Sequence, residues 1–134
     1  MNKPKIVILL PLLTLLIAIL ACSGSVSTAN IPEAWLSTDE AGSNRTTVFS
    51  QDAVFYAQVQ LKNAPDDTEL KAVWTAVNAD GVEPNLQIME TDYTGGDEQV
   101  HFSLSNDDLW PTGEYKVEIF LNGKLDKTLT FQVQ

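Results

Sequence analysis

Residues 113–133 read GEYKVEIFLNGKLDKTLTFQV. Apolar side chains occupy every second position from Tyr115 to Leu121, and again from Leu129 to Val133. A period of two is typical of a strand with one buried face. Asn122-Gly123 separates the two halves, and a two-residue type I′ turn favours this pair because both of its residues need positive φ. The stretch therefore predicts an antiparallel hairpin closed by Asn122 and Gly123.

The same alternation recurs upstream, with turn residues after about every ten positions. Clear strands are expected at 53–61 and 100–104, weaker ones at 46–49, 70–77 and 86–91, and an edge segment at 34–37. Gly95-Gly96 is expected to close another hairpin. After the N-terminal run described below, no segment keeps an apolar stripe at helical spacing for three turns. The pattern predicts an all-β fold, a single antiparallel β-sandwich of about seven strands.

The residues just before this hairpin add a local motif. Residues 107–117 read DDLWPTGEYKV, with a Gly-x-Tyr-x-Val core preceded by acidic residues. This core resembles the tyrosine corner of immunoglobulin-like domains, and the stretch 110–133 resembles the end of bacterial immunoglobulin-like or fibronectin-like modules. The resemblance implies that the Tyr115 hydroxyl bonds to backbone just upstream, with Gly113 ending the turn. It also implies that Trp74 is the core tryptophan of the third strand, although either Ala72/Trp74/Ala76 or Val73/Thr75/Val77 fits an inward face.

The N-terminus has a different character. Lys3 and Lys5 precede an apolar run over 6–21, and Cys22, the single cysteine of the chain, follows it. A charged start, a short apolar stretch and a small residue before the break are typical of a secretory signal peptide. The ending Ile19-Leu20-Ala21-Cys22 resembles the lipobox of bacterial lipoproteins, with Leu20 bulkier than the small residue often found there. The resemblance implies that Cys22 is the first mature residue, carries acyl chains such as palmitate, and anchors the protein in the lipid bilayer.

Three other interpretations of this N-terminus stay open. A transmembrane helix needs about 18–20 apolar residues, and this run is shorter and contains Pro11. An ordinary cleaved signal leaves the thiol of Cys22 unexplained. A buried core helix is disfavoured by the lysines before the run and the Ser/Thr/Gly residues after it. We expect three parts: a signal peptide at 1–21, a lipidated cysteine and flexible tether at 22–32, and one β-sandwich domain at 33–134.

Location follows from the same resemblance. We expect an extracytoplasmic protein, lipid-anchored in the cell membrane or, in an envelope with two membranes, in the outer membrane. Ser23, standing where an aspartate would retain a lipoprotein, favours the outer membrane by family resemblance.

Composition limits the partners. Two of the eight basic residues lie in 1–21, so residues 22–134 carry six basic against 18 acidic residues, a net charge of −12. Such a surface repels nucleic-acid phosphates and anionic headgroups, so no nucleic acid is expected as a partner. It either keeps an exported domain soluble or favours cationic partners. With one cysteine no intrachain disulfide forms, and the fold depends on its hydrophobic core.

The sequence contains few residues that indicate catalysis or metal binding. His101, the single histidine, is expected on the outward face of a strand as an ordinary surface residue, and not as a catalytic base. No glycine-rich phosphate loop is present, and with 18 acidic residues a carboxylate pair is uninformative. We expect no enzyme and no cofactor. Acidic pairs at 66–67, 97–98 and 107–108 leave calcium open, with turn formation the plainer explanation.

Aromatic residues are the best candidates for a binding face. Trp35, Tyr93 and Trp110 are expected near strand ends, where rings stack on sugars or anchor protein interfaces. Trp110 leaves two alternatives: an exposed interaction residue, or a ring folded back over the open end of the sandwich. The sequence favours a non-enzymatic protein-interaction or envelope-structural module, with a carbohydrate-binding module that uses exposed tryptophans as the alternative.

Overall fold

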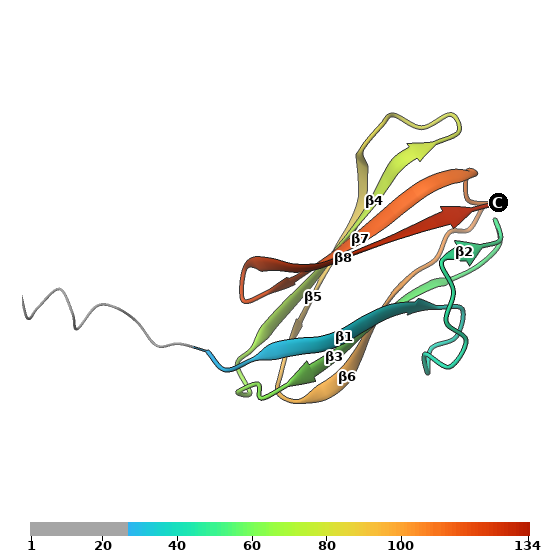
Figure 1. Cartoon of the computed structure of the whole chain (residues 1–134). Helices are drawn as coiled ribbons and strands as arrows, with labels where there is room; N and C mark the ends of the chain where they lie inside the picture. The colour runs from blue at the N-terminus through green and yellow to red at the C-terminus, as the bar shows by residue number, and fades with distance from the viewer. Residues whose placement is uncertain (1–26) are drawn as a thin grey trace, which may run out of the picture.

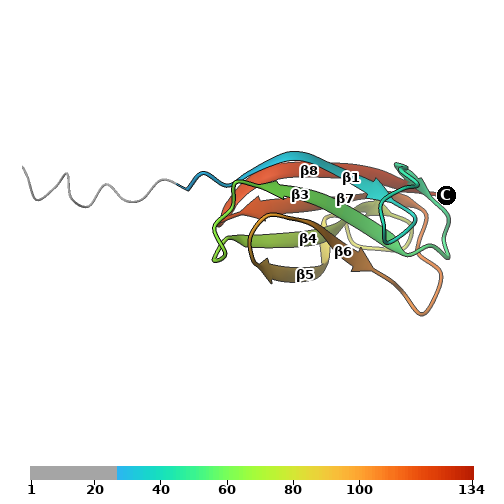
Figure 2. The same cartoon turned by 90° about the horizontal axis from the view of Figure 1, so that it is seen from below.

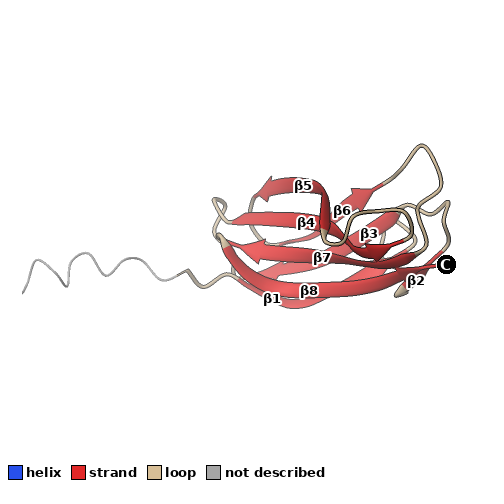
Figure 3. Cartoon of the chain, turned by 90° about the horizontal axis from the view of Figure 1, so that it is seen from above, coloured by secondary structure: helices blue, strands red, loops and turns tan. Residues whose placement is uncertain are grey.

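The computed structural model describes residues 27–134, and in this part of the chain every regular element is a β-strand (Figure 1, Figure 3). The expected signal peptide and Cys22 lie outside the described residues. The strands are β1 (Asn30–Ser37), β2 (Val48–Phe49), β3 (Phe55–Lys62), β4 (Glu69–Ala79), β5 (Leu86–Thr94), β6 (Glu98–Leu104), β7 (Gly113–Leu121) and β8 (Lys124–Val133). None of the described residues forms a helix that could cross a membrane.

The strands form two sheets that pack face to face (Figure 2). A three-stranded sheet has the order β1-β3-β6, and a five-stranded sheet has the order β2-β8-β7-β4-β5. All pairs are antiparallel except β2 with β8, which run parallel. The predicted all-β sandwich is therefore confirmed, with the two-residue β2 as an eighth strand.

Alternation along the strands sets the core. In β3, Phe55, Ala57, Val59 and Leu61 are completely buried, as the period of two predicts. In β4 the inward set is Ala72, Trp74 and Ala76, which decides between the two faces that the sequence left open. Aromatic rings concentrate at one end of this core, where Phe55 contacts the rings of Phe49, Trp74, Trp110, Tyr115 and Phe131.

Of the two expected hairpins, one is present in the structure and the other is not. Asn122 and Gly123 have φ of 48° and 83° and join β7 to β8, which confirms the type I′ prediction. The hairpin expected at Gly95-Gly96 is wrong, because β5 pairs with β4 whereas β6 pairs with β3. The two glycines instead cross from one sheet to the other. Val100 and Phe102 are buried against the core from the opposite sheet, and this burial outweighs the local turn signal.

The domain starts earlier than expected. Asn30 already pairs with Lys62, and Ile31 is buried, so the last residues of the expected 22–32 tether belong to β1. A single apolar residue in a polar stretch is a weak strand signal by itself, and pairing with β3 stabilises the strand here. The described chain enters at the end of the sandwich that carries the β7–β8 turn, and the C-terminus lies at the opposite end (Figure 1).

Candidate functional site

Trp110 is part of the core. Its side chain is 6% exposed and stacks on Phe55 with ring centroids 4.7 Å apart. The indole N–H donates to the carbonyl of Ala53 at 2.9 Å, and the Trp110 carbonyl accepts from the side chain of Gln51 at 2.9 Å. The interpretation of Trp110 as an exposed binding residue is thus wrong. The ring folds back over the open end of the sandwich because it covers a cluster of aromatic side chains that would otherwise be exposed there.

Tyr115 closes the same end. Its hydroxyl donates to the carbonyl of Pro111 at 2.6 Å, the contact that a tyrosine corner makes. Burial raises the pKa of this hydroxyl. Gly113 has φ of 146°, and a Cβ there would overlap the carbonyl of Asn78 on β4, so glycine allows the close approach of the two strands. Tyr115 and Gly113 have the structural roles that the resemblance implied.

Trp35 is half-buried on β1, and one face of its ring is occupied. The guanidinium of Arg45 lies 4.0 Å from the ring centroid, and the indole N–H donates to the carbonyl of Gly42 at 2.9 Å. Arg45 also donates two hydrogen bonds to Glu33, at 2.9 and 3.1 Å. This hydrogen bonding lowers the pKa of Glu33 and raises that of Arg45. Trp35 therefore serves chiefly to hold the segment 38–45 against the sheet.

Gln58 is the main residue that sequence reasoning missed. In the predicted strand 53–61 Gln58 alternates with the apolar residues, which predicts a position on the polar outer face, yet its side chain is completely buried. Its amide group donates to Ser37 Oγ at 3.2 Å and to the Glu40 carbonyl at 2.9 Å, and its Oε1 accepts from Gln99 at 3.1 Å. The loop 38–44 covers it. The signal available in the sequence was the run Thr38-Asp39-Glu40-Ala41-Gly42, whose length suffices to fold over a strand.

Tyr93 lies at the other end of the molecule, near the β7–β8 turn. It is half-buried on β5, and its hydroxyl donates to Glu98 Oε2 at 2.8 Å. This hydrogen bond to a carboxylate raises the pKa of the tyrosine. Tyr93 borders a hollow of the surface.

That hollow is a groove of about 530 Å³ on the outer face of the five-stranded sheet. Its lining side chains come from β4, β5 and the β7–β8 hairpin, and those used below are Glu69, Lys71, Glu90, Asp92 and Phe120. Lys71 Nζ lies 3.0 Å from Glu90 Oε1, and hydrogen bonding with Glu90 raises the pKa of Lys71, helped by the charges of Asp92 and Glu69. The same contact lowers the pKa of Glu90. Three carboxylates against one ammonium leave the groove acidic.

The residues considered for chemistry lie apart. His101 is exposed on β6, with Nε2 3.2 Å from Glu40 Oε1, as expected for an outward position. Asp97 accepts the N–H of Ala64 and ties two loops together, whereas Asp107 and Asp108 are exposed in the loop before β7. Over residues 27–134, no three His, Cys, Asp or Glu side chains are grouped to hold a metal ion.

Comparison with known proteins bears on the fold. No family model matches the chain, and no curated protein matches it. Among solved structures, an immunoglobulin-like protein from Pseudomonas aeruginosa is similar at 17% identity and a TM-score of 0.51, over 83% of this chain and 100% of that one. This chain has an immunoglobulin-like fold.

Two larger proteins contain a similar sandwich. The alkylpurine DNA glycosylase AlkC of Pseudomonas fluorescens matches at 12% identity and a TM-score of 0.54, over 81% of this chain. A β-glucosidase from Listeria innocua matches at 15% identity and a TM-score of 0.51, over 82% of this chain. This chain spans 31% of the length of the glycosylase and 17% of the length of the glucosidase, so the similarity concerns one part of each protein. At these identities only the fold is shared.

Proposed function

We propose that this chain is a bacterial lipoprotein, anchored outside the cytoplasm through lipid on Cys22, whose immunoglobulin-like domain is a non-enzymatic protein-interaction module. The observation that carries the anchoring is the position of Cys22 directly after the apolar run 6–21. Asn30, the first residue of β1, follows Cys22 by eight residues, which extended span at most about 28 Å. An anchored domain would therefore work close to the bilayer.

The surface of the domain supports binding better than catalysis. His101, the histidine that a nucleophilic triad would need, is exposed and paired with Glu40. The acidic groove on β4 and β5 is a shaped surface with unequal charge, which selects partners by electrostatic complementarity. Protein interaction is therefore the function we favour for this module.

The carbohydrate-binding alternative has less support. It needs exposed tryptophan rings, and the chain has three tryptophans. Trp74 and Trp110 are buried, and one face of the Trp35 ring is covered by Arg45. A sugar platform would have to use Tyr93 instead, a single ring that is half-buried on β5.

The anchoring is tested by phase separation in a cloud-point detergent. Wild-type protein expressed in bacteria is expected in the detergent phase, and Cys22→Ser in the aqueous phase, because the variant lacks acyl chains. Ser25→Ala is the matched control and should behave as wild type. Retention of Cys22→Ser in membranes after a salt wash would instead indicate an uncleaved apolar helix and refute the lipoprotein assignment.

The interaction role is tested by cross-linking in intact cells. Full-length protein with a photo-reactive residue at exposed positions around the sandwich should give discrete adducts with envelope proteins. Adducts with peptidoglycan or glycan alone, or none at any position, would argue against a protein-interaction module.

A further inference from the structure

β5 is the longest free edge of the two sheets, ahead of β1 with eight residues and β6 with seven. β5 is the last strand of the five-stranded sheet, and eight of its nine residues pair with β4, with a bulge at Ile88. The opposite edge of that sheet is the two-residue β2, which offers little to pair with. Proteins commonly protect long edges with lysine, proline, a bulge or a covering loop, and the β5 sequence LQIMETDYT has a bulge at Ile88 but no lysine or proline. Most of its side chains are exposed, so the edge is accessible to another strand.

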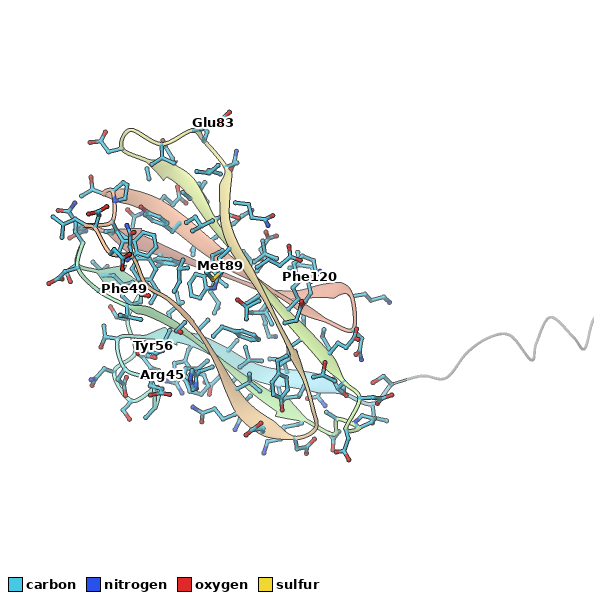
Figure 4. All side chains as sticks on the ribbon, turned by 180° about the vertical axis from the view of Figure 1, so that it is seen from behind. Arg45, Phe49, Tyr56, Glu83, Met89 and Phe120 are labelled. Carbon is cyan, nitrogen blue, oxygen red and sulfur yellow. The ribbon has the colours of Figure 1, made fainter. Side chains whose placement is uncertain are left out.

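The inward face of β5 projects beyond the smaller sheet. Leu86 pairs with Ala76 and Met89 pairs with Trp74, and both partners are buried in the core. Leu86 and Met89 nevertheless keep 45% and 46% of their surface exposed. Figure 2 shows β5 at the outer margin of the sandwich, and Figure 4 labels Met89 on it. An additional strand beside β5 would cover these two apolar side chains.

The outward face of β5 forms one wall of the acidic groove. Glu90 pairs with Val73 and Asp92 pairs with Lys71, so both carboxylates lie on the face opposite the core. Lys71 is the lysine that lines this groove, and Glu90 already contacts it. Phe120, half-buried on β7 and labelled in Figure 4, lines the same groove, and an aromatic ring attracts cations. Charge complementarity therefore calls for basic side chains on this face.

The same charges argue against a second copy of the chain. Two β5 strands pairing antiparallel over their full length would place Glu90, the middle residue of the strand, opposite its own copy, and like charges on paired strands are destabilising. A strand with lysine or arginine on one face and apolar residues on the other meets both faces of β5 favourably. This alternation is what a period-two strand provides.

We propose that β5 is the docking edge for a basic, extended segment of a partner protein, which adds to the five-stranded sheet as a further strand. Its basic side chains lie over the groove against Asp92, Glu90 and Phe120, and its apolar side chains cover Leu86 and Met89. Main-chain hydrogen bonds to β5 supply affinity, and the alternating side chains supply specificity. The proposal rests on the proposed protein-interaction function and specifies its surface and the chemistry of its partner.

The test uses full-length protein in a nonionic detergent and synthetic peptides of nine residues, the length of β5. The probe alternates lysine and valine. One control has the same composition with all lysines before all valines, and a second replaces lysine by glutamate. A third keeps the probe's sequence but carries N-methyl groups on its central amides, which removes the main-chain donors. Fluorescence anisotropy of labelled peptide measures binding, and amide hydrogen exchange locates it.

The probe is expected to bind at least about tenfold more tightly than each control peptide, and to slow amide exchange in β5. The double variant Glu90→Lys/Asp92→Lys should weaken binding about tenfold or more. Asp107→Lys/Asp108→Lys changes the net charge equally in an exposed loop elsewhere, and should stay within about twofold of wild type. Circular dichroism confirms that both variants are folded, and Met89→Gln, which keeps all charges, gives an independent loss through the inward face.

Each of the following results would overturn the proposal. If the N-methylated or block-sequence peptide binds as tightly as the probe, the binding is nonspecific attraction of cations. Equal losses of affinity in the two charge variants would lead to the same conclusion. Protection outside β5 would place the interaction elsewhere. Self-association of the free protein that Glu90→Lys/Asp92→Lys abolishes would make a second copy the occupant. If envelope adducts persist in the Glu90→Lys/Asp92→Lys protein, the interaction function stands while the β5 assignment fails.

Discussion

The Tyr115 hydroxyl and the Pro111 carbonyl are joined by a 2.6 Å hydrogen bond across the turn that leads into β7. The ring of Tyr115 is buried and stacks on Phe131 at 5.5 Å, so this hydroxyl has little access to other partners. The pair fixes the turn that also carries Trp110 into the core.

Tyr115→Phe should therefore lower the free energy of unfolding by about 1–3 kcal/mol, because the carbonyl of Pro111 loses its partner while the ring packing is kept. Denaturant unfolding measures the change. Tyr93→Phe removes a hydroxyl that bonds to the exposed Glu98, and should cost no more than about 0.5 kcal/mol. Equal effects of the two variants would show that Tyr115 does not act as a corner residue.

Trp110→Ala should destabilise the domain by about 3–5 kcal/mol, since it removes a buried ring and leaves a cavity against Phe55. The neighbouring Leu109 is 63% exposed, and Leu109→Ala should stay within about 0.5 kcal/mol of wild type. A thermal or urea melt of both variants decides the matter. An unchanged free energy of unfolding in Trp110→Ala would contradict the buried position of Trp110.

Gln58→Met keeps the volume of the side chain but removes its hydrogen bonds to the loop 38–44 and to Gln99. We expect a loss of about 1–3 kcal/mol, because the Glu40 carbonyl is left without its donor. Amide exchange at Gly42 should accelerate as the loop loosens. Gln60→Met, in the same strand but half-exposed, is the control, and similar exchange in both variants would contradict the role given to Gln58.

Asp39 gives the loop a pH dependence. Its carboxylate accepts the N–H groups of Asn44 at 2.7 Å and Ser43 at 2.9 Å, and these bonds lower its pKa below the usual 3.8. A carboxyl whose pKa is lower in the folded state stabilises the fold above the unfolded pKa, and this contribution disappears as pH falls through the folded pKa. Wild type should exceed Asp39→Asn in stability at neutral pH, and the difference should disappear as pH falls through the lowered pKa of the folded state. Urea midpoints measured against pH test this, with Asp107→Asn as the control; a difference that stays constant with pH would exclude the carboxylate as its source.

Much of this fold follows from local pattern. The alternation around Val59, Val100 and Val117 predicts strands with the observed inward faces, and Asn122-Gly123 predicts the observed turn, because both signals are local consequences of φ and side-chain direction. The resemblance placed Tyr115 correctly for the same reason: its partner is four residues away.

Errors arose where partners lie far apart in sequence. Gly95-Gly96 reads as a hairpin, but the burial of Val100 against the opposite sheet decides the pairing of β6. Trp110 contacts Phe55 and Ala53, and no short window around either residue shows this. Gln58 appears as a surface residue until the loop 38–44 is folded over it. The groove combines β4, β5 and β7, so its acidity emerges only from the sheet order.

The direction of β1 also has a mechanical meaning. β1 begins at the end of the domain where the described chain enters, and it runs toward the opposite end beside β3, from Asn30↔Lys62 to Ser37↔Tyr56 (Figure 1). A pull between an anchor at Cys22 and a partner held farther out would act along the axis of this strand. Its hydrogen bonds to β3 would then share the load in shear instead of opening one after another. A module anchored in this way would resist mechanical unfolding without any disulfide bond.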